Sequence, residues 1–420
     1  MGMSKMELIN CPVCSCTNIK KILNLKSGNI DRSTLYENII IQSCEKCGHV
    51  FNRLMKDDYI NLLNYYNHEY APTNIGSSNL GGDRPGGKST YTMNRHLQLF
   101  NLFKSYTNEE MNILDVGCAM GGMLSFLKDQ GYDNLYGIDL TQKYLDIAAK
   151  NKDLKIEFGS AEDIPFDDNT FELVILDQVM EHLINPKKAF QEAKRVLKKG
   201  GLFCIGVPDA GRYNQEYFFD FYWFLMREHI QHFNLTNLEI LANLEGFELI
   251  KFSHTDTPMM SEKMILPNLN VIFKYTGNKK EIESDNLSKR LPFKMQQYIS
   301  AELNRLDKKK ILFKKIAQEG RPVYIWGIGR EFLYLYENTA LKICNIKGLF
   351  DSSEYKQKNS TIDGLAVSNT DKISLAAEDS ILIITAIAHQ DLVSRVAISS
   401  GYKGDIITVA LLDNTRPKLD

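Results

Sequence analysis

The chain has 420 residues, more than one ordinary hydrophobic core accommodates, so two or three domains are expected. Its 44% hydrophobic and 24% charged residues are typical of a globular protein, and a formal net charge of -2 argues against nucleic-acid binding through bulk basic charge. No apolar run is long enough to span a bilayer and the first residues lack a signal peptide's apolar stretch, so we expect a cytoplasmic protein without a membrane partner.

Five of the eight cysteines lie before residue 50, which in a cytosolic protein indicates metal ligation rather than a disulfide scaffold. Two Cys-x-x-Cys pairs supply the predicted ligands of a structural zinc ion: Cys11, Cys14, Cys44 and Cys47. Four thiolates saturate a tetrahedral ion and leave no position for catalysis. Cys16 could compete with Cys14 as a ligand, and we expect His49 to be a bystander.

Apolar strands alternate with amphipathic helices from residue 90 to about 275, which predicts a doubly wound α/β fold with a parallel sheet. The expected strands are Asn112–Val116, Leu135–Asp139, Lys155–Gly159, Phe171–Asp177 and Leu202–Val207. Charged helical patterns follow over about 279–318, and a second, Rossmann-like α/β unit begins near Pro322. We therefore expect a zinc-binding domain at 1–60, a central domain at 61–278, and a helical connection plus C-terminal domain at 279–420.

The first strand of the central segment runs into a loop of small residues that is suited to a nucleotide-like ligand. Asp115 ends this strand, and Gly117 and Gly121 allow the backbone to approach a ligand closely at the start of a helix. Asp139 ends the second strand, where an acidic side chain can accept hydrogen bonds from ribose hydroxyls. A dinucleotide site is the alternative, but the glycine spacing does not fit G-x-G-x-x-G.

The ordered series that continues through Gly159–Phe166 and Asp177–Leu183 resembles the class I S-adenosylmethionine-dependent methyltransferases. The resemblance implies that Asp115 and the glycines hold the methionine part of the cofactor, Asp139 the ribose, and Ser160 to Glu162 the adenine edge. The implied cofactor contacts are Asp115, Gly117, Cys118, Gly121, Asp139, Leu140, Ser160, Ala161, Glu162 and Asp177.

The order of zinc-binding, methyltransferase and C-terminal α/β segments resembles the sugar-nucleotide C-methyltransferases, which act on deoxy-keto sugars. In that family a Tyr-x-Glu-His element supplies the base that removes a proton next to the keto group. Glu228 and His229 match this element, but Met226 stands at the tyrosine position, and Tyr222 lies one helical turn earlier. His182, in the segment after the fourth strand, is the third candidate catalytic residue, and we expect it to shape the methyl pocket rather than to transfer a proton.

A histidine near its unperturbed pKa can accept a proton while a neighbouring carboxylate orients it, which favours His229 with Glu228 as the catalytic pair. The alternative is that His229 or His232 only packs near the cofactor. The loop tyrosines Tyr65, Tyr66 and Tyr70 resemble residues that close over the cofactor, or they form a surface aromatic cluster.

The predicted partner is a small molecule, and the resemblance implies a nucleotide sugar of a surface-polysaccharide or natural-product pathway. Gly327, Gly329 and Asp351 resemble a nucleotide-binding βαβ unit, and in the resembled family the C-terminal domain helps to bind the nucleotide. Two other hypotheses remain: O- or N-methylation of another polar metabolite or glycan precursor, and a non-catalytic binding module.

Overall fold

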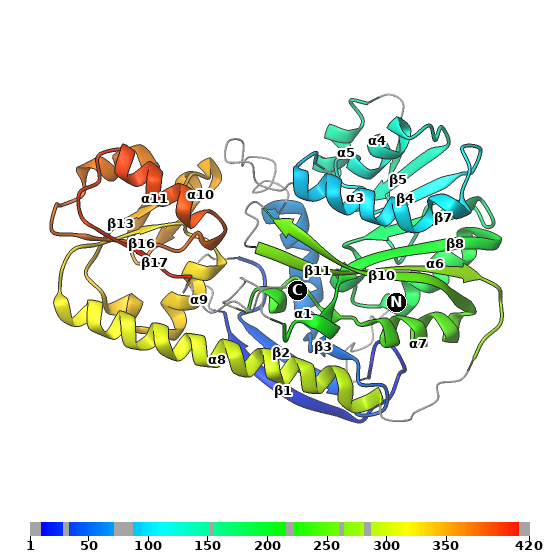
Figure 1. Cartoon of the computed structure of the whole chain (residues 1–420), viewed down its shortest axis with the longest axis horizontal. Coiled ribbons are helices and arrows are strands. Elements are labelled where there is room, and N and C mark those ends of the chain that lie inside the picture. Colours follow the sequence, from blue (N-terminus) through cyan, green and yellow to red (C-terminus); the bar gives the residue numbers. More distant parts are fainter. Residues whose placement is uncertain are drawn as a thin grey trace, which may run out of the picture.

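The structure is a computed structural model that describes residues 10–27, 33–70, 87–151, 154–215, 222–259, 264–280 and 287–410. Three β-sheets follow one another along the chain, with four, seven and six strands (Figure 1). The expected α/β fold class with a doubly wound central sheet is confirmed.

The N-terminal sheet is antiparallel and has the strand order β1-β2-β3-β9. Its strands are β1 (Ile19–Lys26), β2 (Asn38–Cys44), β3 (Val50–Asn52) and β9 (Gln231–His232). The fourth strand therefore comes from the middle of the chain and directly follows the candidate residues Glu228 and His229. The α1 helix (Lys56–Tyr65) and a π-helical turn (Tyr66–Tyr70) lead out of this sheet.

The central sheet has the order β10-β11-β8-β7-β4-β5-β6, and only β11 runs antiparallel to its neighbours. A dinucleotide-binding sheet has six parallel strands, so the antiparallel β11 is a departure from it. The strands are β4 (Ile113–Val116), β5 (Leu135–Asp139), β6 (Lys155–Phe158), β7 (Phe171–Asp177), β8 (Leu197–Pro208), β10 (Phe247–Met259) and β11 (Met264–Tyr275). The helices are α3 (Thr90–Phe103), α4 (Gly122–Asp129), α5 (Gln142–Ala148), α6 (Pro186–Val196) and α7 (Leu235–Glu245).

Helices cover both faces of the central sheet. Since successive side chains of a strand point to opposite faces, both sets of side chains are buried. Leu114 and Val174 pack in the core that includes α6 and α7, whereas Ile113 and Ile175 pack in the core that includes α3 and α4. The continuous apolar runs of β4 and β7 in the sequence follow from this double coverage.

The charged segment after the central sheet forms one helix, α8 (Leu287–Glu319), of 33 residues. The helical pattern that the sequence predicts over this segment is confirmed, and Pro292 is accommodated inside the helix. The C-terminal sheet follows with the order β14-β15-β13-β12-β16-β17, in which only the β14 pairing is antiparallel. Its elements are β12 (Val323–Trp326), α9 (Arg330–Asn338), β13 (Ile346–Phe350), α10 (Glu354–Asn359), β14 (Thr361–Ile362), β15 (Leu365–Ser368), β16 (Ile381–Ile384), α11 (Gln390–Ser399) and β17 (Asp405–Thr408).

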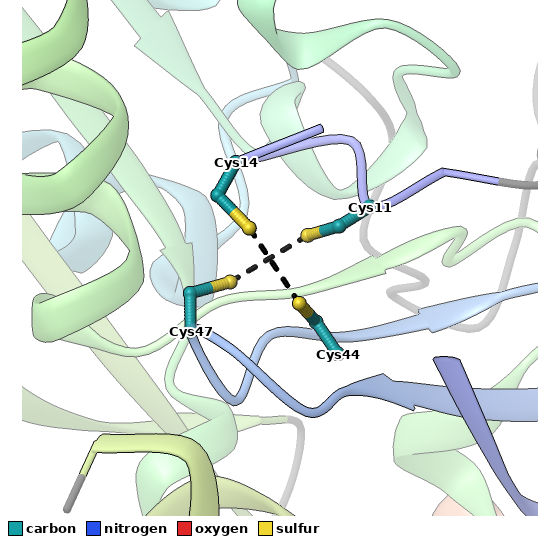
Figure 2. Close-up of side chains that lie close together, drawn as sticks. All are labelled: Cys11, Cys14, Cys44 and Cys47. Atoms are coloured by element: carbon teal, nitrogen blue, oxygen red, sulfur yellow. Dashed lines mark hydrogen bonds between the residues drawn. The ribbon is translucent and has the colours of Figure 1, made fainter. Parts of the chain in front are cut away.

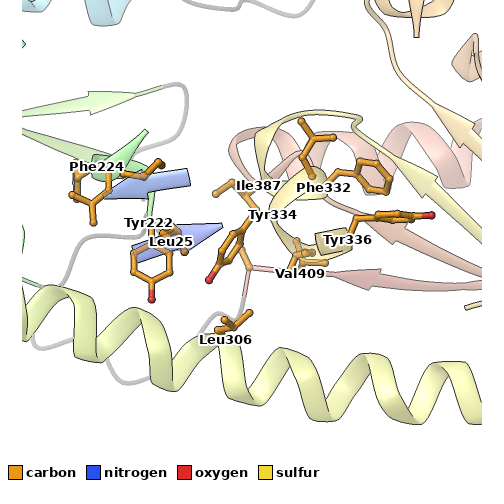
Figure 3. Packing of buried hydrophobic residues seen from close by; sticks show 14 of the residues in the cluster. Leu25, Tyr222, Phe224, Leu306, Phe332, Tyr334, Tyr336, Ile387 and Val409 are labelled. Atoms are coloured by element: carbon orange, nitrogen blue, oxygen red, sulfur yellow. The ribbon is translucent and has the colours of Figure 1, made fainter. Parts of the chain in front are cut away.

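One apolar cluster joins the N-terminal sheet, α8 and the C-terminal sheet (Figure 3). Leu25 of β1, Leu306 of α8 and Tyr334 of α9 belong to it, together with Tyr222 and Phe224 from the segment before β9. The packing holds the segment that carries Glu228 and His229 between all three parts of the chain. Among the described residues, no helix is both long and apolar enough to cross a membrane.

Candidate active site

The glycines of the loop after β4 have the backbone conformation and the close contacts that the sequence predicts. Gly117 has φ +78°, and a Cβ there would lie 2.5 Å from Cγ2 of Val179. Gly121, with φ +79°, caps the N-terminus of α4. A side chain at Gly117 would fill the space next to the loop, so this residue keeps the cradle open for a ligand.

Acidic side chains gather at the carboxyl ends of β4, β5 and β7. Asp139 accepts hydrogen bonds from the backbone N–H groups of Ala119 (2.9 Å) and Thr141 (2.8 Å), so its carboxylate faces the loop. Asp115 is only 4% exposed, and burial, followed by the charges of Asp177 and Asp139, raises its pKa to about 8. A cationic ligand group would offset this clustering of negative charge.

A pocket at this edge of the sheet holds about 1220 Å³ of empty space, open solvent included. The predicted cofactor residues in its wall are Gly117, Asp139, Leu140, Ser160, Ala161 and Glu162. Three residues of α1 and the turn that follows also line the pocket: Leu62, Leu63 and Tyr66. His182, from the 3-10 helix after β7, is a further residue of its wall. The pocket is large enough for a nucleoside-sized ligand.

Four of the predicted cofactor residues are not in the pocket wall. Asp115 lies behind it, Gly121 forms the helix cap, and Cys118 is buried in the core on the α4 side. Asp177 instead forms a buried ion pair with Arg95 of α3, with 2.8 Å between Nε and Oδ2. Arg95 precedes the first strand of the sheet and belongs to no motif, so no signal in the sequence points to this ion pair.

The three candidate catalytic residues lie together beside this pocket. The 3-10 helix Met180–His182 after β7 positions His182, and the segment before β9 positions Glu228 and His229. The imidazole rings of His182 and His229 are 5.0 Å apart between centroids. The hydroxyl of Tyr65 donates to the Glu228 carboxylate at 2.5 Å, so α1 also reaches the cluster.

Tyr66 provides a second hydroxyl, 3.0 Å from Nδ1 of His182. Tyr65, Tyr66 and Tyr70 contact one another through their rings, and burial raises the pKa values of Tyr65 and Tyr66 well above their usual range. The side chains of Tyr65 and Tyr66 are half-buried, so the structure does not show these two residues as part of a surface aromatic cluster.

The predicted orientation of His229 by the Glu228 carboxylate is not what the structure shows. That carboxylate contacts Tyr65, and the His229 imidazole instead donates to the backbone carbonyl of Phe224. Burial lowers the pKa of His229 well below its usual value, with His182 contributing. The ring is therefore neutral near pH 7 and keeps a lone pair.

Three neighbouring residues take other roles. His232 is buried in β9 and bonds Asn52 at 3.2 Å, which favours the packing alternative for it. Tyr222 cannot replace the missing tyrosine, because it packs against Tyr298 and Tyr334 on the side of α8 and α9. Met226 likewise lines a cleft with Arg227 and α9 residues.

The four predicted zinc ligands converge, as Figure 2 shows. The sulfur atoms of Cys11 and Cys47 are 3.5 Å apart, as are those of Cys14 and Cys44. Sulfurs around a tetrahedral zinc ion are roughly 3.8 Å apart at a Zn–S length of about 2.3 Å, so this donor set fits the ion. Cys16 is not part of the cluster, and His49 is buried and bonds Gln231 rather than lying on the surface.

The C-terminal sheet repeats the backbone pattern of the central loop. Asp351 follows β13 and accepts hydrogen bonds from the N–H groups of Ile328 (2.8 Å) and Ser353 (2.9 Å), as Asp139 does in the central domain. Here the ammonium group of Lys356 also lies 3.0 Å from the carboxylate. A second pocket of about 710 Å³, open solvent included, is lined by Asp351, Lys356 and Trp223, among others.

The family model described as "Methyltransferase domain" matches residues 114–205. The chain is similar to an uncharacterized protein of Methanocaldococcus jannaschii, with 31% identity over 166 residues that cover 39% of this chain and 71% of that protein. It is also similar to an uncharacterized methyltransferase of Schizosaccharomyces pombe, with 37% identity over 128 residues, 27% of this chain and 46% of the relative. The chain thus spans less than half of this second relative, and 35% of another protein of M. jannaschii.

Among solved structures, a methyltransferase from Listeria monocytogenes described as dependent on S-adenosylmethionine matches with a TM-score of 0.37 and 16% identity, over 44% of this chain and 99% of that one. One from Methanosarcina mazei matches with a TM-score of 0.35 and 18% identity, over 43% and 97%.

Proposed function

We propose that the chain, whose residues 114–205 match the methyltransferase domain, is a class I S-adenosylmethionine-dependent methyltransferase. Its proposed acceptor is a carbon atom of a nucleotide-linked deoxy-keto sugar. The observation that carries this proposal is the cluster of Tyr65, Glu228, His229 and His182 beside the cofactor pocket. S-adenosylmethionine supplies an activated methyl group, so the protein has to position the acceptor and remove one proton.

Removal of a proton next to a ketone makes carbon the nucleophile. The C–H electron pair moves into the new carbon–carbon double bond, and the carbonyl pair moves onto oxygen. The carbon then forms its bond to the methyl group while the methyl–sulfur bond breaks, with that electron pair remaining on sulfur. Either the Glu228 carboxylate or the His229 lone pair can take the proton, since both belong to the element that resembles the sugar C-methyltransferases.

Tyr65 compensates for methionine at position 226. Its hydroxyl contacts the Glu228 carboxylate. In the resembled family, the tyrosine two residues before the glutamate is expected to supply a hydroxyl. A hydroxyl at this position can donate a hydrogen bond to the carboxylate or to the oxygen of the acceptor. The family tyrosine and Tyr65 thus reach one site from different segments of the chain.

The pocket of the C-terminal domain supports a nucleotide as the carrier of the sugar. It lies at the carboxyl ends of the neighbouring strands β12 and β16, where the strand order of the sheet reverses. Open α/β sheets bind nucleotides at such a point. Trp223 lines it and stacks with the guanidinium of Arg330 at 4.2 Å, close to the segment of Glu228. An aromatic face for a base and nearby cations for phosphates suit a nucleoside diphosphate.

A partial reaction tests the proposal without methyl transfer. The enzyme is incubated in D₂O with S-adenosylhomocysteine and a nucleotide-linked keto sugar, and proton NMR follows exchange at the carbon next to the ketone. We expect exchange with the native enzyme and its loss in Glu228→Gln and His229→Ala. Glu245→Gln, a buried glutamate at the far end of α7, is the matched control and should keep exchange.

The alternative is O- or N-methylation of another polar metabolite, for which no carbon-bound proton is removed. An enzyme that methylates a hydroxyl or amine catalyses no such exchange with any keto sugar, and this result contradicts the proposal.

A further inference from the structure

A second group of potential metal ligands lies at the wall of the cofactor pocket. Glu181 and His182 come from the 3-10 helix after β7, and His229 comes from the segment before β9. One ligand atom from each residue lies within 4.8 Å of the other two. Glu181 is 2% exposed and His229 is 8% exposed, so the group is enclosed by protein.

The hydrogen bonds outside this group fix which atoms face inwards. Nδ1 of His182 lies 2.9 Å from the carbonyl oxygen of Glu228, which can only accept, so Nδ1 carries the proton. The Nε2 atom of His182 then carries the lone pair, and it lies 3.8 Å from Oε1 of Glu181.

In His229 the two ring nitrogens have exchanged roles, and Nδ1 is the atom that carries the lone pair. Its Nδ1 atom has no hydrogen-bond partner among the described residues, so the backbone hydrogen bond at Phe224 must come from Nε2. A ligand histidine in metalloproteins has this arrangement, with one nitrogen held by a carbonyl group and the other turned to the ion.

Glu181 completes the set with Oε2, which has no hydrogen-bond partner in the described part of the chain. Two buried polar atoms of this group, Oε2 of Glu181 and Nδ1 of His229, thus lack a hydrogen-bond partner in the described part of the chain, which is unfavourable unless a ligand satisfies them.

We propose that Glu181, His182 and His229 bind one divalent cation of the Mn²⁺, Fe²⁺ or Zn²⁺ class. Two imidazoles and one carboxylate leave open coordination positions on such an ion. His182 lines the cofactor pocket, so an ion held by this group would lie at the wall of that pocket.

The role of this cation rests on the proposed function. A keto oxygen gains negative charge as the adjacent proton leaves, and a cation beside that oxygen stabilises the charge. With Nδ1 of His229 engaged by the ion, the proton goes to the Glu228 carboxylate, whose own contact is the Tyr65 hydroxyl. His229 is then a metal ligand, and Glu228 is the base.

Manganese is the suitable probe because four thiolates select zinc, whereas a set that includes a carboxylate also accepts Mn²⁺. The full chain, with its cysteine-bound zinc retained, is titrated with Mn²⁺ and followed by electron paramagnetic resonance. We expect one tightly bound ion per chain, at least tenfold weaker binding in Glu181→Gln and in His229→Ala, and unchanged binding in the control Glu245→Gln. Glu228→Gln should bind Mn²⁺ normally and yet lose proton exchange.

Circular dichroism of each variant excludes misfolding, and His182→Asn is the second variant if Glu181→Gln does not fold. Equal Mn²⁺ binding by native protein and the Glu181, His182 and His229 variants overturns the inference, as does full proton exchange after removal of the added metal by a chelator. In the second case the proposed function stands. Tight Mn²⁺ binding without exchange of any keto sugar would retain the metal site and refute the acceptor.

Discussion

The carboxyl group of Asp115 should make the stability of the folded protein depend on pH. Its pKa rises from 3.8 to about 8 because the side chain is buried beside Asp177 and Asp139. At pH 9 the folded protein must hold this carboxylate ionised, and the difference between the two pKa values corresponds to on the order of 5 kcal/mol as an upper bound.

The sign follows from proton uptake. Between pH 4 and pH 8 the folded state holds a proton on Asp115 that the unfolded state has lost, so this group lowers the stability progressively as the pH rises through that window. Asp115→Asn removes the effect. We expect the variant to match the native protein near pH 3.5, below the unfolded pKa, and to exceed its unfolding free energy by a few kcal/mol at pH 9.

Urea denaturation at the two pH values measures this difference, and Asp129→Asn, at an exposed position on α4, is the control. The same exchange should weaken binding of S-adenosylhomocysteine, measured by calorimetry, because a negative charge next to the pocket wall is lost. Native binding should release a proton at pH 7, which appears as a dependence of the heat on the buffer. An equal pH dependence of stability in native and variant protein would refute the reasoning.

Three further predictions concern the cradle, the zinc site and the base. Gly117→Ala should destabilise the protein by about 2 kcal/mol or more in thermal or urea unfolding, because its Cβ overlaps a side chain, whereas Gly320→Ala, also at positive φ but in open space, should cost about 1 kcal/mol. Cys11→Ser should remove zinc as measured by metal analysis, and Cys16→Ser should retain it; zinc loss in both would contradict the assignment. Tyr65→Phe should lower kcat about 10- to 100-fold with unchanged cofactor binding, and a changed cofactor affinity with unchanged kcat would exclude this role.

The central fold was predictable because both faces of its sheet are covered. Double burial turns β4 and β7 into continuous apolar runs, and the residues that end β4 and β5 carry the acidic groups of the site. The β10 and β11 hairpin was missed because its strands mix polar residues into a buried sheet. Asn268 and Asn270 of β11 donate there to threonine hydroxyls of β10, a pairing that only the folded hairpin provides.

The zinc ligands and much of the cofactor pocket were predictable for a local reason, since each lies in one short motif. The remainder of the site depends on contacts across the chain. Tyr65 meets Glu228 only because β9 joins the N-terminal sheet, and a strand of two residues leaves no periodicity to detect. Glu181 stands directly before His182, but its unpartnered oxygen is visible only in the folded protein. The expected domain boundaries stay a prediction.

Carbon NMR of the product tests the acceptor most directly. S-adenosylmethionine carrying a ¹³C methyl group is incubated with the enzyme and a nucleotide-linked deoxy-keto sugar, and the environment of the labelled carbon is read from the spectrum. We predict a methyl group bonded to the sugar carbon next to the ketone. A methyl carbon bonded to oxygen or nitrogen would contradict the account, as would transfer only to acceptors that lack a ketone.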